Sequence, residues 1–282
     1  MRPSLLRDFL LWFFDHPPYS PFVTANIAVD VTGARRYLAA LNDAAAGRPR
    51  VTLMHLFVAL VARLYREFPQ ANARVIGGQI RALERVGVAL PVDLLSDQSG
   101  SKNEVGLALV RDVDRRTLRA LAEATRAAVA DERRGEPRDP LLRLLVPLAD
   151  RTPRWLLHGA LTGLDRAAHS RLLSPLFHRL APVSVAVTNP GAVFGPLEGA
   201  RFLGASMSPP NRLCPVGSVI GLSAIQDEVV VIDGAPAVRP MLPVSYVFDH
   251  RLFDGVMCGR ILLRLCEMLR DPAAVLGPDG EG

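Results

Sequence analysis

The stretch VSYVFDHRLFDGVMCGRILLRLCEML, from Val244 to Leu269, joins two structural patterns. An alternating apolar run ends at His250, and apolar residues then recur at helical spacing from Val256 onward. Asp254 lies at the junction, where aspartate is a favoured helix N-cap. The stretch therefore predicts a core strand, a tight turn that carries a histidine, and an amphipathic helix that runs to about residue 270.

The turn itself suggests proton-transfer chemistry. An unperturbed imidazole, with a pKa of about 6.5, can accept and return a proton near neutral pH, and a strand end would fix its position. Asp254 could cap the helix or pair with an arginine to hold the turn, and Gly255 would allow a close backbone approach. The same residues are also consistent with a structural role alone, in which His250 is a polar residue at a strand end and Asp254 is an ordinary helix N-cap. These few residues alone do not decide between the two interpretations.

Composition indicates one globular domain over residues 1–282. Of these residues 49% are apolar and 22% are charged, and neither repeats nor a Pro/Ser-rich linker divide the chain. Residues 1–20 predict an amphipathic N-terminal arm that stops at Pro17–Pro18 and lacks the cleavage site of a signal peptide. No apolar run reaches the ~20 residues of a membrane span. We expect a cytoplasmic protein that makes no membrane contact.

The net charge and the cysteine content indicate which classes of ligand the protein could bind. The net charge of +5, carried almost entirely by arginine, suits anionic small molecules such as nucleotide phosphates, although a GC-rich genome would enrich arginine equally well. No nucleic-acid-binding module is recognisable, so no nucleic acid partner is expected. Cys214, Cys258 and Cys266 form neither a C-x-x-C pair nor an even disulfide framework, which predicts thiols rather than disulfides or a metal site.

The other histidines do not suggest catalysis or zinc binding. His55 lies within an apolar helical pattern and is expected to be structural. His158, His169 and His178 are separated by 11 and 9 residues, which does not match the H-x-x-x-H spacing of zinc ligands.

The remaining patterns predict a series of strands and helices. The segment 136–182 is apolar, rich in arginine and interrupted by prolines, which predicts several short helices. We expect this segment to be buried by packing, with an acceptor channel, an oligomer contact or a membrane-facing surface as alternatives. The other predicted elements are strand 22–31, a helix ending near Gly47, a helix from the N-cap Thr52 to Pro69, a hairpin turn at Gly77–Gly78, strands 79–95 and 104–114, helix 114–135, strand 183–188 with a turn at Asn189–Pro190–Gly191, and strands within 218–249 with a hairpin at Asp233–Gly234.

Four passages resemble the acyltransferase component of 2-oxo acid dehydrogenase complexes, a family related to chloramphenicol acetyltransferase. VSYVFDHRLFDG followed by LRDPAAVL resembles its H-x-x-x-D-G signature with the adjoining strand and helix. VTLMHLFVALVARLYREFPQANAR, VGLALVRDVDRRTLRALAEATRAA and VAVTNPGAVFG resemble three further segments in the same order. The resemblance covers roughly residues 20–135 and 183–277. It implies an α/β, two-layer α+β sandwich in which helices flank a mixed sheet.

The resemblance also implies roles for individual residues. His250 falls on the general base that activates a thiol or hydroxyl acceptor for attack on the thioester of acyl-CoA. Thr188 falls on the hydroxyl residue, normally serine, that donates a hydrogen bond to the tetrahedral oxyanion. Asp254 and Gly255 fall on structural positions of the signature, with Arg7 as the candidate partner of Asp254. Asn189 falls in the turn beside the hydroxyl residue.

Coenzyme A or acyl-CoA would be a substrate, no metal would be needed, and the active channel would lie between the subunits of a homotrimer or of a larger assembly of trimers. Three departures from the family pattern limit the analogy. No lipoyl-bearing domain is found, so a lipoyl group would come from a separate carrier protein. The segment 136–182 is longer than the family's connection there. Thr188 precedes His250 by 62 residues, with an extended stretch at 196–217. A non-catalytic oligomeric scaffold and a CoA-dependent O- or N-acetyltransferase of small molecules therefore remain alternatives.

Overall fold

A seven-stranded mixed sheet forms the frame of the computed structural model, which describes residues 20–45, 47–93, 105–134, 152–192, 202–213 and 215–282. Its strands follow the order β1-β9-β7-β6-β4-β5, with β8 paired to the far end of β9. β6 lies parallel to both β7 and β4, and the other neighbours are antiparallel. The strands are β1 (Phe22–Asp30), β4 (Val88–Asp93), β5 (Val105–Val110), β6 (Val185–Thr188), β7 (Ser218–Leu222), β8 (Gln226–Ile232) and β9 (Ala235–Asp249).

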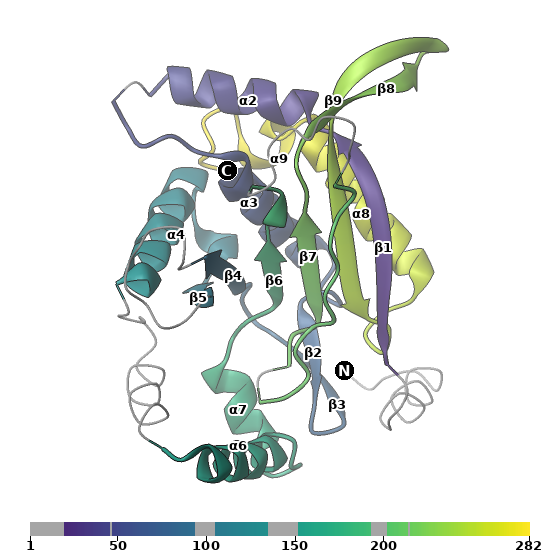
Figure 1. The fold of residues 1–282 in the computed structure, drawn as a ribbon. Coiled ribbons are helices and arrows are strands. Elements are labelled where there is room, and N and C mark those ends of the chain that lie inside the picture. The colour runs from purple at the N-terminus through teal and green to yellow at the C-terminus, as the bar shows by residue number, and fades with distance from the viewer. Residues whose placement is uncertain (1–19, 46, 94–104, 135–151, 193–201, 214) are drawn as a thin grey trace.

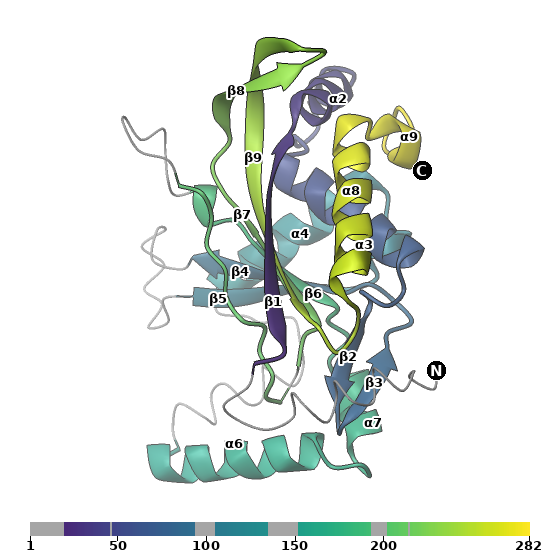
Figure 2. The same ribbon diagram turned by 90° about the vertical axis from the view of Figure 1, so that its right-hand side faces the viewer.

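Helices cover one face of this sheet, as the nearly edge-on view in Figure 2 shows. α3 and α8 run along that face, and α4 packs beside α3 over β5 (Figure 1). The helices of the body are α2 (Thr32–Asp43), α3 (Leu53–Glu67), α4 (Leu118–Arg133), α8 (Gly255–Arg270) and α9 (Ala273–Leu276). The predicted architecture, a mixed sheet flanked by helices, is confirmed.

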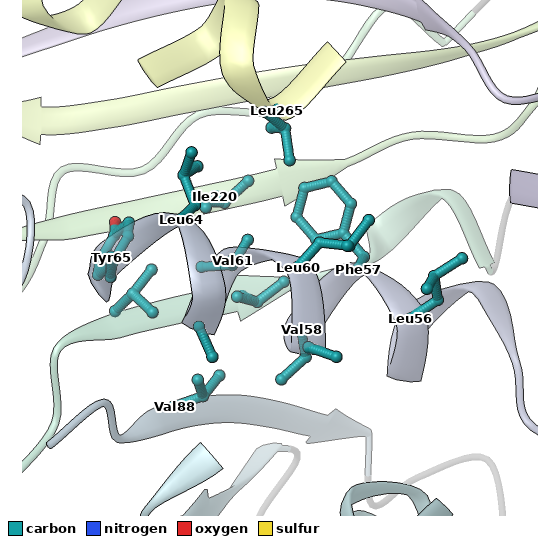
Figure 3. Close-up of a cluster of buried hydrophobic side chains, with 14 of the residues drawn as sticks. Leu56, Phe57, Val58, Leu60, Val61, Leu64, Tyr65, Val88, Ile220 and Leu265 are labelled. Carbon is teal, nitrogen blue, oxygen red and sulfur yellow. The ribbon is translucent and has the colours of Figure 1, made fainter. Parts of the chain in front are cut away.

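The central helix α3 is buried on nearly every side because its sequence is apolar around the whole circumference. Thr52 caps it, as predicted, and the N–H of Thr52 donates in return to Nδ1 of His55 (3.1 Å). Figure 3 shows its side chains between Val88 of β4, Ile220 of β7 and Leu265 of α8. This packing fixes the sheet relative to α8. It therefore also fixes the turn that joins β9 to the start of α8.

The structure also places a β2–β3 hairpin and two helices, α6 and α7, at the lower end of the molecule in both views. β2 (Ala73–Ile76) and β3 (Gln79–Ala82) join at Gly77–Gly78, the predicted hairpin turn, where both φ angles are positive. α6 (Arg154–Ala168) and α7 (Ser174–Leu180) confirm that the described part of 136–182 is helical, but only α7 is short, since α6 has 15 residues. No helix within the described ranges is long and apolar enough to cross a membrane.

Two sequence-based boundaries are wrong. The predicted strand 79–95 is interrupted between β3 and β4. Backbone crowding accompanies this break, since a Cβ at Gly87 would lie 1.9 Å from the carbonyl oxygen of Pro182. The helix predicted from Asp114 begins only at Leu118, because Asp114 is buried and accepts the N–H of Val86 (3.1 Å) while Thr117 caps the helix.

Candidate active site

The backbone of the turn after β9 is fixed at His250. The His250 N–H donates to the carbonyl oxygen of Pro21, just before β1 (2.8 Å). The partly buried imidazole ring lies 6.0 Å, centroid to centroid, from the ring of Phe248 at a tilt of 40°. The predicted position of the histidine, at the end of a core strand, is therefore confirmed.

An ion pair that the sequence analysis missed spans His250. The Nε and Nη2 atoms of Arg251 donate to the carboxylate of Asp249 (3.0 and 2.8 Å), and the Arg251 N–H donates to Oδ1 (2.9 Å). Both side chains are buried, so the pair requires this near-ideal geometry to offset the cost of desolvation. The available signal was the pair of opposite charges on either side of a histidine at a strand end. The pair locks the turn on both sides of the imidazole.

The residues after the turn act as a helix start. Oδ1 of Asp254 accepts the N–H of Met257 (2.9 Å), which confirms the N-cap alternative. Gly255 is exposed, and no heavy atom of the described chain lies within 4 Å of the position that a Cβ would take. Contacts with the described residues therefore do not require a glycine there. Arg7, the candidate partner of Asp254, lies outside the described residues.

An aromatic and hydroxyl cluster supports the turn from the helix side. The rings of Phe248 and Phe253 stack 4.5 Å apart, and Tyr246 stacks on both. The hydroxyl of Tyr65 contacts those of Ser218 and Tyr246. Burial raises the pKa of Tyr65 to about 12 and that of Tyr246 well above its usual value. These tyrosines stay neutral at physiological pH and support the turn without exchanging protons.

Burial also explains the behaviour of the described cysteines. Cys258 and Cys266 of α8 are free thiols, and burial raises the pKa of Cys258 to about 11 and also raises that of Cys266. They are protonated at neutral pH, as expected of structural thiols. Cys214 lies outside the described residues.

Thr188 lies at the end of β6, held by close packing of the backbone. It is partly buried and pairs with Gly221 of β7. The predicted turn at 189–191 is confirmed as a short helical turn, η2 (Pro190–Ala192), which follows Asn189. A Cβ at Gly191 would lie 2.1 Å from the backbone of Ser223 and Ala224, so no larger residue fits without displacement. Oδ1 of Asn189 is buried and has no hydrogen-bond partner among the described residues.

A row of small and polar residues extends from Thr188 across the sheet, on the face opposite the helices. Gly221 pairs with Ser245 of β9, and Ser245 pairs with Asn26 of β1. The stretch after residue 201 passes over this row, because a Cβ at Gly221 would lie 2.6 Å from the carbonyl oxygen of Ala205. The row places hydroxyl and amide groups beside Thr188, and none of the described helices covers them.

The structure does not bring Thr188 and His250 together within one chain. Asp249 donates its N–H to the carbonyl oxygen of Gly217, whereas Thr188 is level with Gly221. Four strand residues separate the two levels by roughly 13 Å, and two strand spacings of about 4.8 Å add to this distance. In Figure 1 the arrowheads of β6 and β9 accordingly point to opposite ends of the sheet. One chain cannot place both side chains on the same carbonyl group.

The other histidines have structural contacts. Burial, together with the nearby charge of Arg126, lowers the pKa of His55 to about 4. His169 lies 3.3 Å from Asp165, and Nε2 of His178 lies 3.0 Å from the carbonyl oxygen of Ala82. Across the ranges that the structure describes, no cluster of three or more His, Cys, Asp or Glu side chains could hold a metal ion.

Comparison with known proteins identifies relatives by sequence. Residues 18–139 and 181–277 match the family model described as 2-oxoacid dehydrogenases acyltransferase (catalytic domain). A dihydrolipoyllysine-residue succinyltransferase component of the 2-oxoglutarate dehydrogenase complex from Bartonella vinsonii subsp. berkhoffii is 38% identical over 29% of this chain and 20% of its own length. The mitochondrial succinyltransferase component from Bos taurus is 29% identical over 46% of this chain and 30% of its own length. Each of these alignments thus covers a third or less of the relative's length.

Solved structures show the same fold. A probable dihydrolipoamide acetyltransferase from Listeria monocytogenes 4b F2365 superposes with a TM-score of 0.62 at 18% identity, over 95% of this chain and 93% of that one. The dihydrolipoamide acetyltransferase from Azotobacter vinelandii gives a TM-score of 0.63 at 20% identity, over 96% and 88%. At these identities the likeness concerns the fold alone.

Proposed function

The chain belongs to the family of 2-oxoacid dehydrogenase acyltransferase catalytic domains, and we propose that it transfers an acyl group between coenzyme A and a thiol acceptor. The observation that carries this proposal is the turn after β9, where a buried ion pair and a helix cap fix His250 at the end of a core strand. The preferred acceptor is a dihydrolipoyl group, because the relatives are named dihydrolipoyllysine-residue succinyltransferases.

His250 acts as the general base. A thiol is mostly protonated at neutral pH and must lose its proton before it can attack a thioester. The neutral imidazole accepts that proton as the sulfur attacks the acyl carbonyl carbon. It then returns the proton to the sulfur of the departing coenzyme A, so that no covalent acyl-enzyme is required. The fixed backbone at His250 keeps the imidazole oriented through both transfers.

Thr188 supplies the hydrogen bond to the oxyanion. Negative charge develops on the carbonyl oxygen as the thiol attacks, and a preplaced hydroxyl donor stabilises it without reorganisation. The close packing of Gly191 against Ser223 and Ala224 fixes the strand end from which this hydroxyl projects.

The two groups act together only across a subunit boundary. Since Thr188 and His250 of one chain lie at different levels of the sheet, we propose that His250 of one protomer works with Thr188 of its neighbour. The sheet face without described helices, where Asn26 is exposed and Thr188 is partly buried, provides the polar surface against which the second chain would pack. A cyclic trimer, alone or as the unit of a larger assembly, satisfies this arrangement because it repeats one heterologous contact three times.

The lipoyl group would be carried by a separate protein. The matched family model is a catalytic domain, so a lipoyl group would reach the site from outside this domain. The two described cysteines are free thiols, which supports a reducing cytoplasm as the location.

The direct test is acyl exchange by the purified full chain. Acetyl-CoA and succinyl-CoA are offered with free dihydrolipoamide, and thioester formation on dihydrolipoamide is followed together with release of coenzyme A. We expect exchange by the native chain and its loss in His250→Ala, with unchanged circular dichroism and oligomer mass. Exchange that persists in His250→Ala would contradict the proposal.

The same preparation separates the alternatives. Calorimetry that detects no coenzyme A binding at millimolar concentration would favour a non-catalytic scaffold. Coenzyme A release with small alcohols or amines but not with dihydrolipoamide would retain the reaction type and change the acceptor.

A further inference from the structure

The helices α6 and α7 form a separate unit at one end of the molecule. α7 is anchored on the β2–β3 hairpin: Arg74 donates to the carbonyl oxygen of Ala181, and His178 contacts that of Ala82. α6 packs on α7 and lies crosswise to the strands as the outermost element in Figure 2. This unit falls largely between the two stretches that match the family model, so the family fold does not explain it.

The unit exposes an unusual density of large apolar side chains. The predicted burial of segment 136–182 by packing is wrong for its described part within one chain: Trp155 is 76% exposed and Leu172 is 85% exposed. No other described segment of similar length exposes as many large apolar side chains. The exposed large apolar side chains of this unit are Trp155, Leu156, Leu161, Leu164, Leu172, Leu173, Leu176 and Leu180. An apolar surface of this extent on a soluble domain normally marks an interaction site.

The exposed charged side chains around this surface are positive. Arg166, Arg171 and Arg179 are exposed among the apolar side chains. The acidic residue of α6, Asp165, is turned toward the protein, where it accepts the N–H of Leu213 (2.8 Å) and lies 3.3 Å from His169. The exposed surface of α6 and α7 therefore combines leucines and a tryptophan with positive charge.

We propose that the α6–α7 surface binds an anionic phospholipid bilayer, with α6 lying in the plane of the headgroups. Leucine and tryptophan side chains enter the boundary between headgroups and acyl chains, while the arginines pair with lipid phosphates. This revises the sequence-based expectation of no membrane contact. The outermost position of α6 favours a flat surface over a protein groove, and the arginines select negative charge.

The test uses the full chain with vesicles of phosphatidylcholine, with and without phosphatidylglycerol. Co-sedimentation should occur on vesicles that contain phosphatidylglycerol and weaken with added salt. In a Trp12→Phe background, brominated acyl chains should quench the fluorescence of Trp155. Absence of binding to the anionic vesicles, or equal binding to phosphatidylcholine alone, would overturn the proposal.

Two pairs of variants test the surface itself. Arg166→Gln with Arg171→Gln should weaken partitioning about 25-fold, roughly fivefold for each charge. The matched control replaces two exposed arginines of α2, in Arg35→Gln with Arg36→Gln, and should change partitioning by only about twofold.

Leu172→Gln with Leu176→Gln should weaken partitioning about a hundredfold, roughly tenfold for each side chain. The control Val229→Gln with Val231→Gln, on the exposed face of β8, should leave partitioning within about twofold. If binding survives both surface pairs, another surface makes the contact and the proposal is wrong. If the leucine pair lowers the oligomer mass in light scattering, a second copy covers this surface and the proposal is equally wrong.

Discussion

The turn after β9 and the end of β6 both place a polar side chain at the end of a buried strand, but they are held in different ways. Side-chain hydrogen bonds hold the turn, where Asp249 and Arg251 form a buried pair around His250. Backbone packing holds the end of β6, where Gly191 lies against Ser223 and Ala224 without room for a Cβ. The two halves of the proposed site therefore fail through different substitutions, by loss of charge in one and by gain of volume in the other.

The largest predicted effect is on turnover, and it tests whether His250 and Thr188 of one site come from different protomers. His250→Ala should lower turnover by as much as about 10⁴-fold through loss of the general base. Thr188→Val should lower it by about 10²–10³-fold through loss of the oxyanion donor. If each site combines His250 of one protomer with Thr188 of another, subunits of the two variants that are co-expressed and mixed at random should recover about a quarter of native activity, because a quarter of the contacts then join two intact halves.

Acyl exchange by co-purified, differently tagged subunits measures this recovery. The control mixes the purified variants without subunit exchange. Mixed oligomers that stay as inactive as the separate variants would place both groups in one chain and break the comparison.

The second prediction concerns how the turn is held. Asp249→Ala should lower the free energy of unfolding by about 3–5 kcal/mol, because it removes the carboxylate that pairs with the buried guanidinium of Arg251. Asp254→Ala, a matched loss of a carboxylate in the same turn, should cost only about 1 kcal/mol because it removes an exposed helix cap. Urea unfolding of the two variants gives both values. Equal losses would show that the Asp249–Arg251 pair does not hold the turn.

Periodicity predicted the framework of the fold well, because each strand or helix has a local signature. The alternation of β9, the cap at Thr52, the two-glycine turn at 77–78 and the helix start at Asp254 were all present in the sequence. Local patterns also positioned His250 and Thr188 at strand ends. Each of these features depends on residues that lie close together in the chain.

Features that depend on distant residues could not be predicted in this way. Asp114 resembles a helix start, but the N–H of Val86, 28 residues away, makes it a buried acceptor. The offset between Thr188 and His250 follows from the register of β6, β7 and β9, which no single segment encodes. The exposure of Trp155 is a similar case, because an apolar helix looks the same in sequence whether or not the fold covers it.

The third prediction tests the end of β6 by adding a methyl group. Gly191→Ala should cost up to about 3 kcal/mol of unfolding free energy, because its Cβ would meet the backbone and not a movable side chain. It should also lower turnover by displacing Thr188. Gly255→Ala adds the same methyl group beside the turn, where no described heavy atom lies within 4 Å, and should leave stability within about 0.5 kcal/mol. Thermal unfolding compares the two variants. Equal losses of unfolding free energy would show that backbone packing does not distinguish the end of β6 from the turn after β9.

The smallest predicted effect is a loss of folding stability at acidic pH. It must be known before a loss of activity in acid can be assigned to the active site. His55 is 7% exposed and its pKa in the folded chain is about 4, below the unfolded value of 6.5. The unfolded chain therefore binds more protons between these values, so that stability falls as the pH drops from 6.5 toward 4. At pH 5 this loss amounts to about 2 kcal/mol relative to pH 7.

His55→Gln removes this titration and keeps a side chain that can still accept the N–H of Thr52, because glutamine is favoured at this position of a capping box. Urea unfolding at pH 7 and pH 5 should show the fall in the native chain and a smaller fall in the variant. If acid still inactivates the variant while it remains folded, the loss originates at the active site and not in unfolding. An equal fall in both proteins would show that His55 does not set the acid limit of this fold.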